Sequence, residues 1–102
     1  MDTGETCTYV RRRVGERIEE LRERRGVSQT QLAKMVPMNR TYYNDLVLGK
    51  ANPSLDKLVK IADSLGVPLT DLFFGLGHVP PRCLVEYDQG KASREVRAQS
   101  EQ

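Results

Sequence analysis

The chain of 102 residues has few of the residues on which most catalytic and metal sites depend. It contains no Trp, two Cys and a single His. Cys7 and Cys83 lie near opposite ends without a CxxC spacing, and His78 has no Ser-His-Asp or metal-ligand pattern around it. There is also no glycine-rich phosphate loop. We therefore expect no enzyme, no cofactor and no metal site. The cysteines fit a reduced cytosolic pair, with a disulfide between two mobile ends as the alternative.

Long apolar runs are missing as well. No stretch approaches the roughly 18 apolar residues of a membrane span, and the N-terminal segment has no apolar stretch of signal-peptide length. The net charge of +2 permits nucleic-acid binding without requiring it. The charge is unevenly spread, because residues 11–25 carry seven Arg against four Glu. These features predict one domain in the cytoplasm, without contact with a membrane.

Hydrophobic periodicity and capping residues predict an all-α, compact fold of five helices. The first is expected over 10–25 and ends at Gly26. The second begins after the N-cap Ser28, whose capping-box partner is Gln31, and Pro37 requires it to stop at the preceding residue. The residues expected on its buried side are Leu32, Ala33, Met35 and Val36.

Asn39 is the N-cap of the expected third helix, over 40–48, which Gly49 ends. On a helical wheel, Tyr43 and Leu46 form its buried side. The opposite side is polar and carries Arg40, Thr41, Asn44 and Asp45. Two short helices joined by a tight turn, the second with a polar outer side, predict a helix-turn-helix that places its second helix in the DNA major groove.

Ser54 starts the expected fourth helix, and Pro68 opens a short fifth one. The apolar stripe of the fourth helix is Leu55, Leu58, Val59, Ile61, Ala62 and Leu65. The resulting division is a flexible N-terminus over 1–9, a helix-turn-helix domain over 10–76 and a short non-helical C-terminal tail over 77–102. We expect the tail to be partly disordered or to contact a partner, because it is mostly polar apart from an apolar stretch at its centre.

The residue types predict how DNA would be contacted. Arg pairs with guanine, Asn with adenine, and a Thr methyl group can touch a thymine methyl group. The start of the second helix suits a phosphate, as does the residue beyond the third helix, and the expected phosphate contacts are Gln29, Thr30, Asn39 and Lys50. Two adjacent Phe cannot both point inward from one helix. A dimer interface is therefore expected at Leu72, Phe73 and Phe74.

A family resemblance covers about residues 12–75. It rests on Val14-Gly15-Glu16-Arg17-Ile18, Gly26-Val27-Ser28-Gln29, Leu32-Ala33, Gly49-Lys50, Pro53-Ser54-Leu55 and Leu65-Gly66-Val67. This pattern resembles the phage-repressor/Cro-type (XRE-type) helix-turn-helix family. The resemblance implies a five-helix domain that binds a double-stranded DNA operator as a homodimer. It maps the base-reading positions onto Arg40, Thr41, Tyr42 and Asn44, with Asp45 as a further candidate, and a phosphate contact onto Gln29.

Several positions depart from the family pattern. Pro37 and Met38 occupy the inter-helix turn, and Tyr43 replaces an aliphatic residue. Val47 stands where the family commonly has a Glu that pairs with an Arg of the first helix, which predicts that Arg22 faces solvent or phosphate. The basic residues at 11–13 fit either phosphate contacts or a disordered arm.

Two functions are consistent with this sequence pattern. The first is a sequence-specific transcriptional regulator, most simply a repressor of an inverted-repeat operator. The alternative is an antitoxin or a partner-titrated interaction protein that uses the tail at 77–102 to bind another protein, with DNA binding for autoregulation.

Overall fold

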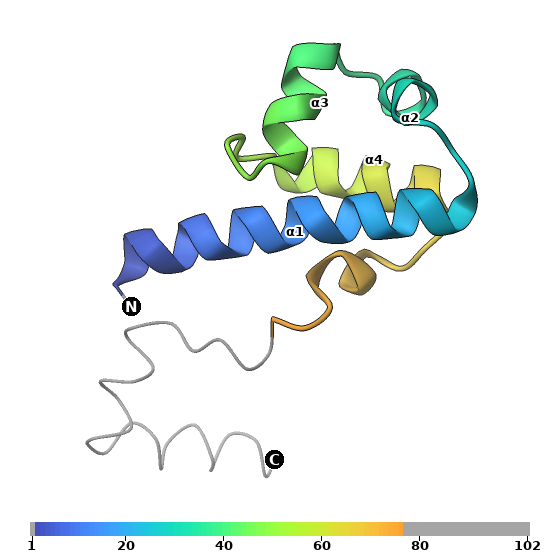
Figure 1. Ribbon diagram of the computed structural model, residues 1–102. Coiled ribbons are helices and arrows are strands. Elements are labelled where there is room, and N and C mark those ends of the chain that lie inside the picture. The colour runs from blue at the N-terminus through green and yellow to red at the C-terminus, as the bar shows by residue number, and fades with distance from the viewer. Residues whose placement is uncertain (1, 77–102) are drawn as a thin grey trace, which may run out of the picture.

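The computed structural model describes residues 2–76, and this part of the chain contains four α-helices and one 3-10 helix (Figure 1). The elements are α1 (Thr3–Arg25), α2 (Gln29–Met35), α3 (Arg40–Val47), α4 (Leu55–Leu65) and η1 (Leu69–Phe73). The expected all-helical fold is confirmed, although the fifth helix is a 3-10 helix. The tail at 77–102 lies outside the described residues. Within residues 2–76, no helix is long and apolar enough to cross a membrane.

The first helix is longer than its apolar pattern predicts, because α1 begins at Thr3 and not at residue 10. Residues 3–9 are therefore helical, where we expected a flexible N-terminus. The Asp2 side chain accepts the N–H of Glu5 at 2.7 Å and caps the helix. An acidic cap followed three residues later by Glu is a recognisable helix start. Apolar periodicity alone misses it because this end of α1 is mostly exposed.

The two short helices of the motif begin where their caps predict. Ser28 and Gln31 form a complete capping box, with bonds of 3.0 and 2.8 Å. The Asn39 side chain accepts the N–H of Tyr42 at 2.7 Å. Helices of this length are not stable alone in water. Their position therefore depends on packing against the rest of the domain.

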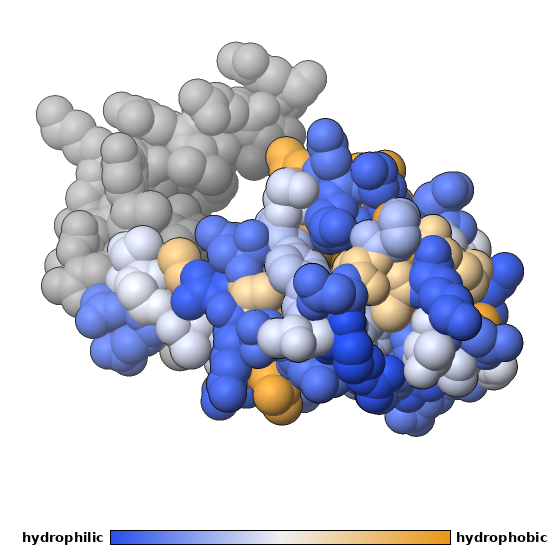
Figure 2. Space-filling model, turned by 90° about the horizontal axis from the view of Figure 1, so that it is seen from above, coloured by the Kyte–Doolittle hydropathy of each residue, from blue (hydrophilic) through white to orange (hydrophobic). Residues whose placement is uncertain are grey.

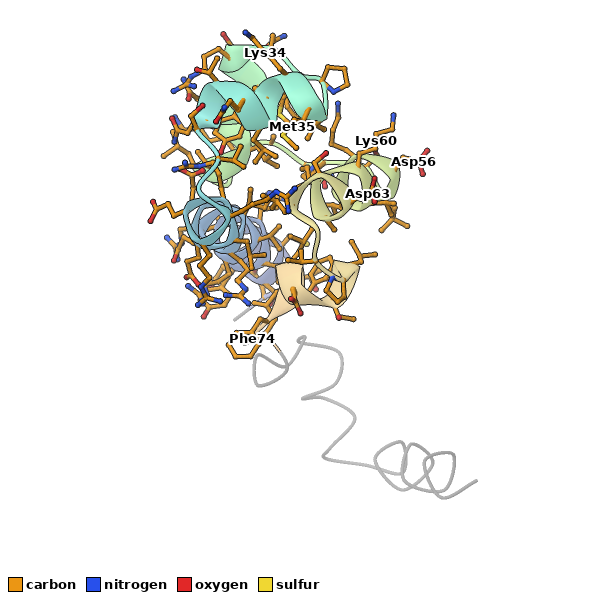
Figure 3. The ribbon with its side chains drawn as sticks, turned by 90° about the vertical axis from the view of Figure 1, so that its right-hand side faces the viewer. Lys34, Met35, Asp56, Lys60, Asp63 and Phe74 are labelled. Carbon is orange, nitrogen blue, oxygen red and sulfur yellow. The ribbon has the colours of Figure 1, made fainter. Side chains whose placement is uncertain are left out.

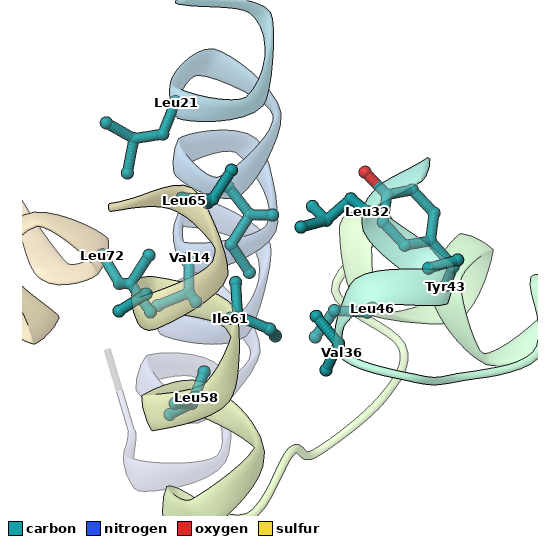
Figure 4. Close-up of a cluster of buried hydrophobic side chains, with 13 residues drawn as sticks. Val14, Leu21, Leu32, Val36, Tyr43, Leu46, Leu58, Ile61, Leu65 and Leu72 are labelled. Carbon is teal, nitrogen blue, oxygen red and sulfur yellow. The ribbon is translucent and has the colours of Figure 1, made fainter. Parts of the chain in front are cut away.

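The core lies where α1, α4 and the helix-turn-helix meet (Figure 4). In Figure 1, α2 and α3 lie on one side of α1 and η1 lies on the other. The buried apolar residues are Val14, Ile18, Leu21, Leu32, Ala33, Val36, Tyr43, Leu46, Leu58, Ile61, Ala62, Leu65 and Leu72. Three residues expected in the core are exposed instead, namely Met35, Leu55 and Val59. Met35 belongs to α2, whereas Leu55 and Val59 belong to α4, so the apolar stripes of these two helices are only partly covered.

Gly15 allows the backbones of α1 and α3 to touch. A Cβ atom at this position would lie 2.6 Å from the carbonyl oxygens of Leu46 and Val47. Gly49, at a φ of +78°, makes a second close backbone contact with α1, because a Cβ atom added at this position would lie 2.7 Å from the Cα atom of Arg12. The C-terminal end of α3 is thereby fixed against α1.

Replacing Gly15 by Ala should destabilise the domain by about 1–3 kcal/mol, because the new methyl group can be accommodated only by moving backbone. Chemical unfolding followed by circular dichroism measures this free energy. Gly4→Ala is the matched control on the same helix, since its Cβ atom would meet nothing closer than 3.4 Å. A Gly15→Ala variant as stable as the control would show that the backbone contact does not constrain α3.

Candidate nucleic-acid interface

The outer side of α3 carries an exposed polar stripe. Arg40, Thr41 and Asn44 are all exposed, as the helical wheel predicts. Figure 2 looks down on α2 and α3 and shows a mostly hydrophilic face with isolated hydrophobic residues. Leu48, at the end of α3, continues the stripe and is 60% exposed. Sequence reasoning missed Leu48, although its spacing from Thr41 and Asn44 is helical.

Arg40 does not extend freely from the start of α3. Its Nη2 atom donates to Oε1 of Gln29 at 2.6 Å, and its guanidinium carbon lies 5.8 Å from the centre of the Tyr43 ring. A guanidinium has five N–H donors, so one bond to Gln29 is compatible with bidentate pairing to a guanine. The structure thus brings together two predicted site residues, Gln29 and Arg40.

The carboxylate of Glu19 joins α1, α2 and α3. It accepts hydrogen bonds from Arg22 at 2.9 and 3.3 Å, from Nε2 of Gln29 at 2.6 Å and from the hydroxyl group of Tyr43. Tyr43 is fully buried, and its hydroxyl group is its only polar side-chain group. Sequence reasoning did not single out Glu19. The absence of a Glu at position 47 was the available signal, because it leaves Arg22 in need of another acceptor.

The expectation that Arg22 faces solvent or phosphate is wrong. Its guanidinium pairs with Glu19 and also donates to the carbonyl oxygen of Val27 at 2.7 Å. Only 13% of its side-chain surface is exposed. Glu19 lies three residues earlier on the same helix and so takes the place of the acceptor that Val47 does not supply.

These contacts determine the charge state of Glu19. Partial burial raises the pKa of its carboxyl group, but the hydrogen bonds from Arg22, Tyr43 and Gln29 together outweigh burial. The resulting pKa lies below the ordinary value of 4.5. The hydrogen bond to Glu19 in turn raises the pKa of Arg22, and burial raises the pKa of Tyr43. The cluster therefore holds one anion, one cation and one neutral phenol.

The other predicted contact residues differ in exposure. Thr30, Asn39 and Lys50 are exposed, and Asn39 also serves as the cap of α3. Two residues of the base-reading set are only half-exposed, Tyr42 and Asp45. The ring of Tyr42 lies 5.4 Å from the ammonium group of Lys57 on α4. Its position is therefore at the side of the stripe that faces α4.

The basic residues at 11–13 belong to α1, so they do not form a disordered arm. Arg13 pairs with Glu16 at 2.7 Å. Arg12 is exposed and lies against Gly49, the residue before Lys50. Arg12 and Lys50 therefore come from elements that touch at the C-terminal end of α3.

The residues expected at a dimer interface differ strongly in exposure. Leu72 is fully buried in the core of its own chain, so its side chain cannot form a surface, which corrects that expectation. Phe73 is half-buried, whereas Phe74 is 67% exposed. The guanidinium of Arg17 lies 4.9 Å from the centre of the Phe74 ring. Of the three residues, Phe74 offers the largest exposed apolar surface.

No cluster of metal-ligating side chains occurs within residues 2–76. Cys7 is exposed on α1. Cys83, with which Cys7 was expected to form a reduced pair or a disulfide, lies outside the described part of the chain. The single His78 lies outside it as well.

Comparison with known proteins places this geometry in a family. The helix-turn-helix family model (HTH_3) matches residues 18–72, which is more than half of the chain. The control protein C.MunI of a Mycoplasma species is 40% identical over 62 residues, covering 60% of this chain and 84% of that protein. The immunity repressor protein of Bacillus phage phi105 is 37% identical over 57 residues, covering 56% of this chain and 40% of that protein. This chain therefore spans less than half the length of that repressor.

Two solved structures share the fold. The restriction-modification controller protein C.AhdI from Aeromonas hydrophila is 34% identical with a TM-score of 0.58, covering 61% of this chain and 94% of that chain. The clp gene regulator ClgR from Corynebacterium glutamicum has a TM-score of 0.60 over 90% of this chain and 83% of that chain. At 22% identity, ClgR bears on the fold alone. The chain belongs to the helix-turn-helix family of the phage-repressor and Cro type, a family of DNA-binding transcription regulators.

Proposed function

We propose that the protein is a cytoplasmic transcriptional repressor that binds an inverted-repeat operator as a homodimer. The observation that carries this proposal is the exposed polar stripe of α3, whose opposite side is buried against the core. A helix reads the major groove only if its outer face presents donors and acceptors and its inner face is held rigidly. Membership of a family of transcription regulators supports this role.

In this proposal, α3 reads bases with Arg40, Thr41, Tyr42, Asn44 and Asp45. Arg40 pairs with a guanine and Asn44 with an adenine, while the methyl group of Thr41 contacts a thymine. Asp45 accepts from the N4 amino group of a cytosine, the base contact that suits a carboxylate. Tyr42, at the side of the stripe, contacts the edge of the site.

Phosphate contacts surround the base-reading stripe. Gln29 and Thr30 lie at the start of α2, and Asn39 lies just before α3. Lys50 follows the other end of α3 and is exposed. The phosphates on both sides of the major groove are then held, which fixes the orientation of α3 without reading sequence.

Arg40→Ala should lose about 1–3 kcal/mol of binding to the operator and abolish the preference at one base pair. Lys50→Ala should instead weaken binding to all sequences alike and reduce the slope of log K against log salt by about one. Fluorescence anisotropy on an operator obtained by selection from random duplexes, with singly substituted versions, measures both effects. An Arg40→Ala variant that retains every base preference would show that this docking is wrong.

The dimer in this proposal forms through the end of η1, with Phe74 at its centre and Phe73 beside it. Phe74 is a large aromatic side chain left mostly exposed, and such residues commonly anchor interfaces. Two copies related by a two-fold axis would place their α3 helices in successive major grooves. The half-site centres would then lie about 34–36 Å apart, or a multiple of this distance.

Phe74→Ala should shift the protein toward monomer and weaken binding to the full inverted repeat more than to a single half-site, because the anchor of the interface is lost. Analytical ultracentrifugation, with and without DNA, measures the assembly. Met35→Ala is the control, because Met35 is also exposed and lies at the opposite end of the molecule (Figure 3). Wild-type protein that stays monomeric at tens of micromolar, free and on DNA, would rule out the dimer.

A further inference from the structure

Gln29 bridges a carboxylate of α1 and a guanidinium of α3. Its Nε2 atom donates to Oε1 of Glu19, and its Oε1 atom accepts from Nη2 of Arg40, both at 2.6 Å. The reverse orientation of the amide would place its NH2 group against the guanidinium and its carbonyl against the carboxylate. Both contacts would be repulsive, so the two charged neighbours fix the orientation of Gln29.

A second route connects the same two charged groups. The hydroxyl group of Tyr43 donates to the other carboxylate oxygen of Glu19, Oε2. The ring of Tyr43 lies beneath the Arg40 guanidinium, with 5.8 Å between the guanidinium carbon and the ring centre. Both oxygens of Glu19 are thus engaged by groups that contact Arg40.

We propose that Glu19 is a positioning residue for base recognition, which sets the orientation of Arg40 through Gln29 and Tyr43. This inference rests on the proposed function, in which Arg40 reads a base. Glu19 belongs to α1, outside the base-reading helix, and only 23% of its side-chain surface is exposed. It determines specificity at one base pair without being one of the groups that touch DNA.

The physical reason is preorganisation. An unrestrained Arg side chain has many rotamers, and ordering it upon binding lowers affinity. A guanidinium already held in one plane favours the one base edge that matches its geometry, since bidentate pairing tolerates little misplacement. Loss of the anchor should therefore reduce discrimination at that base pair more than it reduces general affinity for DNA.

The test compares dissociation constants for an operator selected from random duplexes and for two single substitutions of it. One substitution is at the base pair where Arg40→Ala loses its preference, and the other is at a base pair that Arg40→Ala still discriminates. Glu19→Gln and, separately, Gln29→Met should lower discrimination by about tenfold at the first base pair and leave it unchanged at the second. Glu16→Gln is the matched control, because Glu16 pairs with an Arg three residues away on the same helix and lies 46% exposed.

Circular dichroism first establishes that each variant is folded. A folded Glu19→Gln variant with wild-type discrimination at the first base pair would overturn the proposal, as would an equal loss at both base pairs. Gln29→Met leaves the bonds of Glu19 to Tyr43 and Arg22 in place, so it tests the route through Gln29 if Glu19→Gln unfolds. Wild-type discrimination at the first base pair in a folded Gln29→Met variant would then overturn the proposal, whereas weaker binding to all sequences alike reports only the loss of its phosphate contact. If Arg40→Ala itself retains every preference, the proposed docking fails, and this result is distinct from a failure of Glu19 to position Arg40.

Discussion

The hydrogen bonds to the Glu19 carboxylate are the polar interaction that ties α3 to α1 and α2. The carboxylate accepts hydrogen bonds from α1, α2 and α3 at once, through Arg22, Gln29 and Tyr43. The hydroxyl group of Tyr43 belongs to a fully buried side chain and would otherwise be a donor without an acceptor, which is costly. A half-satisfied polar cluster destabilises a fold, whereas a fully connected one specifies a single arrangement. Within residues 2–76, no buried polar side-chain atom lacks a partner.

This cluster and the glycine contacts constrain α3 at its middle and at its C-terminal end. Tyr43, in the middle of α3, is tied to Glu19, while Gly15 admits the carbonyl oxygens at the end of α3. The helix is therefore fixed in both position and rotation against α1. Its buried side is apolar, and its outer stripe is presented as a rigid surface. A helix of eight residues such as α3 needs this support because it is too short to be stable alone.

Much of this architecture could be predicted from the sequence, because caps and apolar spacing act locally. The capping box at Ser28 and the N-cap at Asn39 fixed the starts of α2 and α3 correctly. The exposed stripe of α3 followed from its helical wheel. The start of α1 was missed, because residues 3–9 lack an apolar face. The partner of Arg22 was missed for another reason: the family pattern places the acceptor on α3, and here Glu19 supplies it from α1.

The titration of the Glu19 carboxyl group, followed by the chemical shift of its carboxyl carbon in NMR spectra, tests the central role of this residue most directly. We predict a pKa below 4.5, because the hydrogen bonds from Arg22, Tyr43 and Gln29 outweigh the effect of burial. A pKa lowered by folding means that the ionised carboxylate stabilises the fold above pH 4.5 and that this stabilisation is lost as the pH falls through the folded-state value. A pKa at or above 4.5, as burial without donors would produce, would contradict the account.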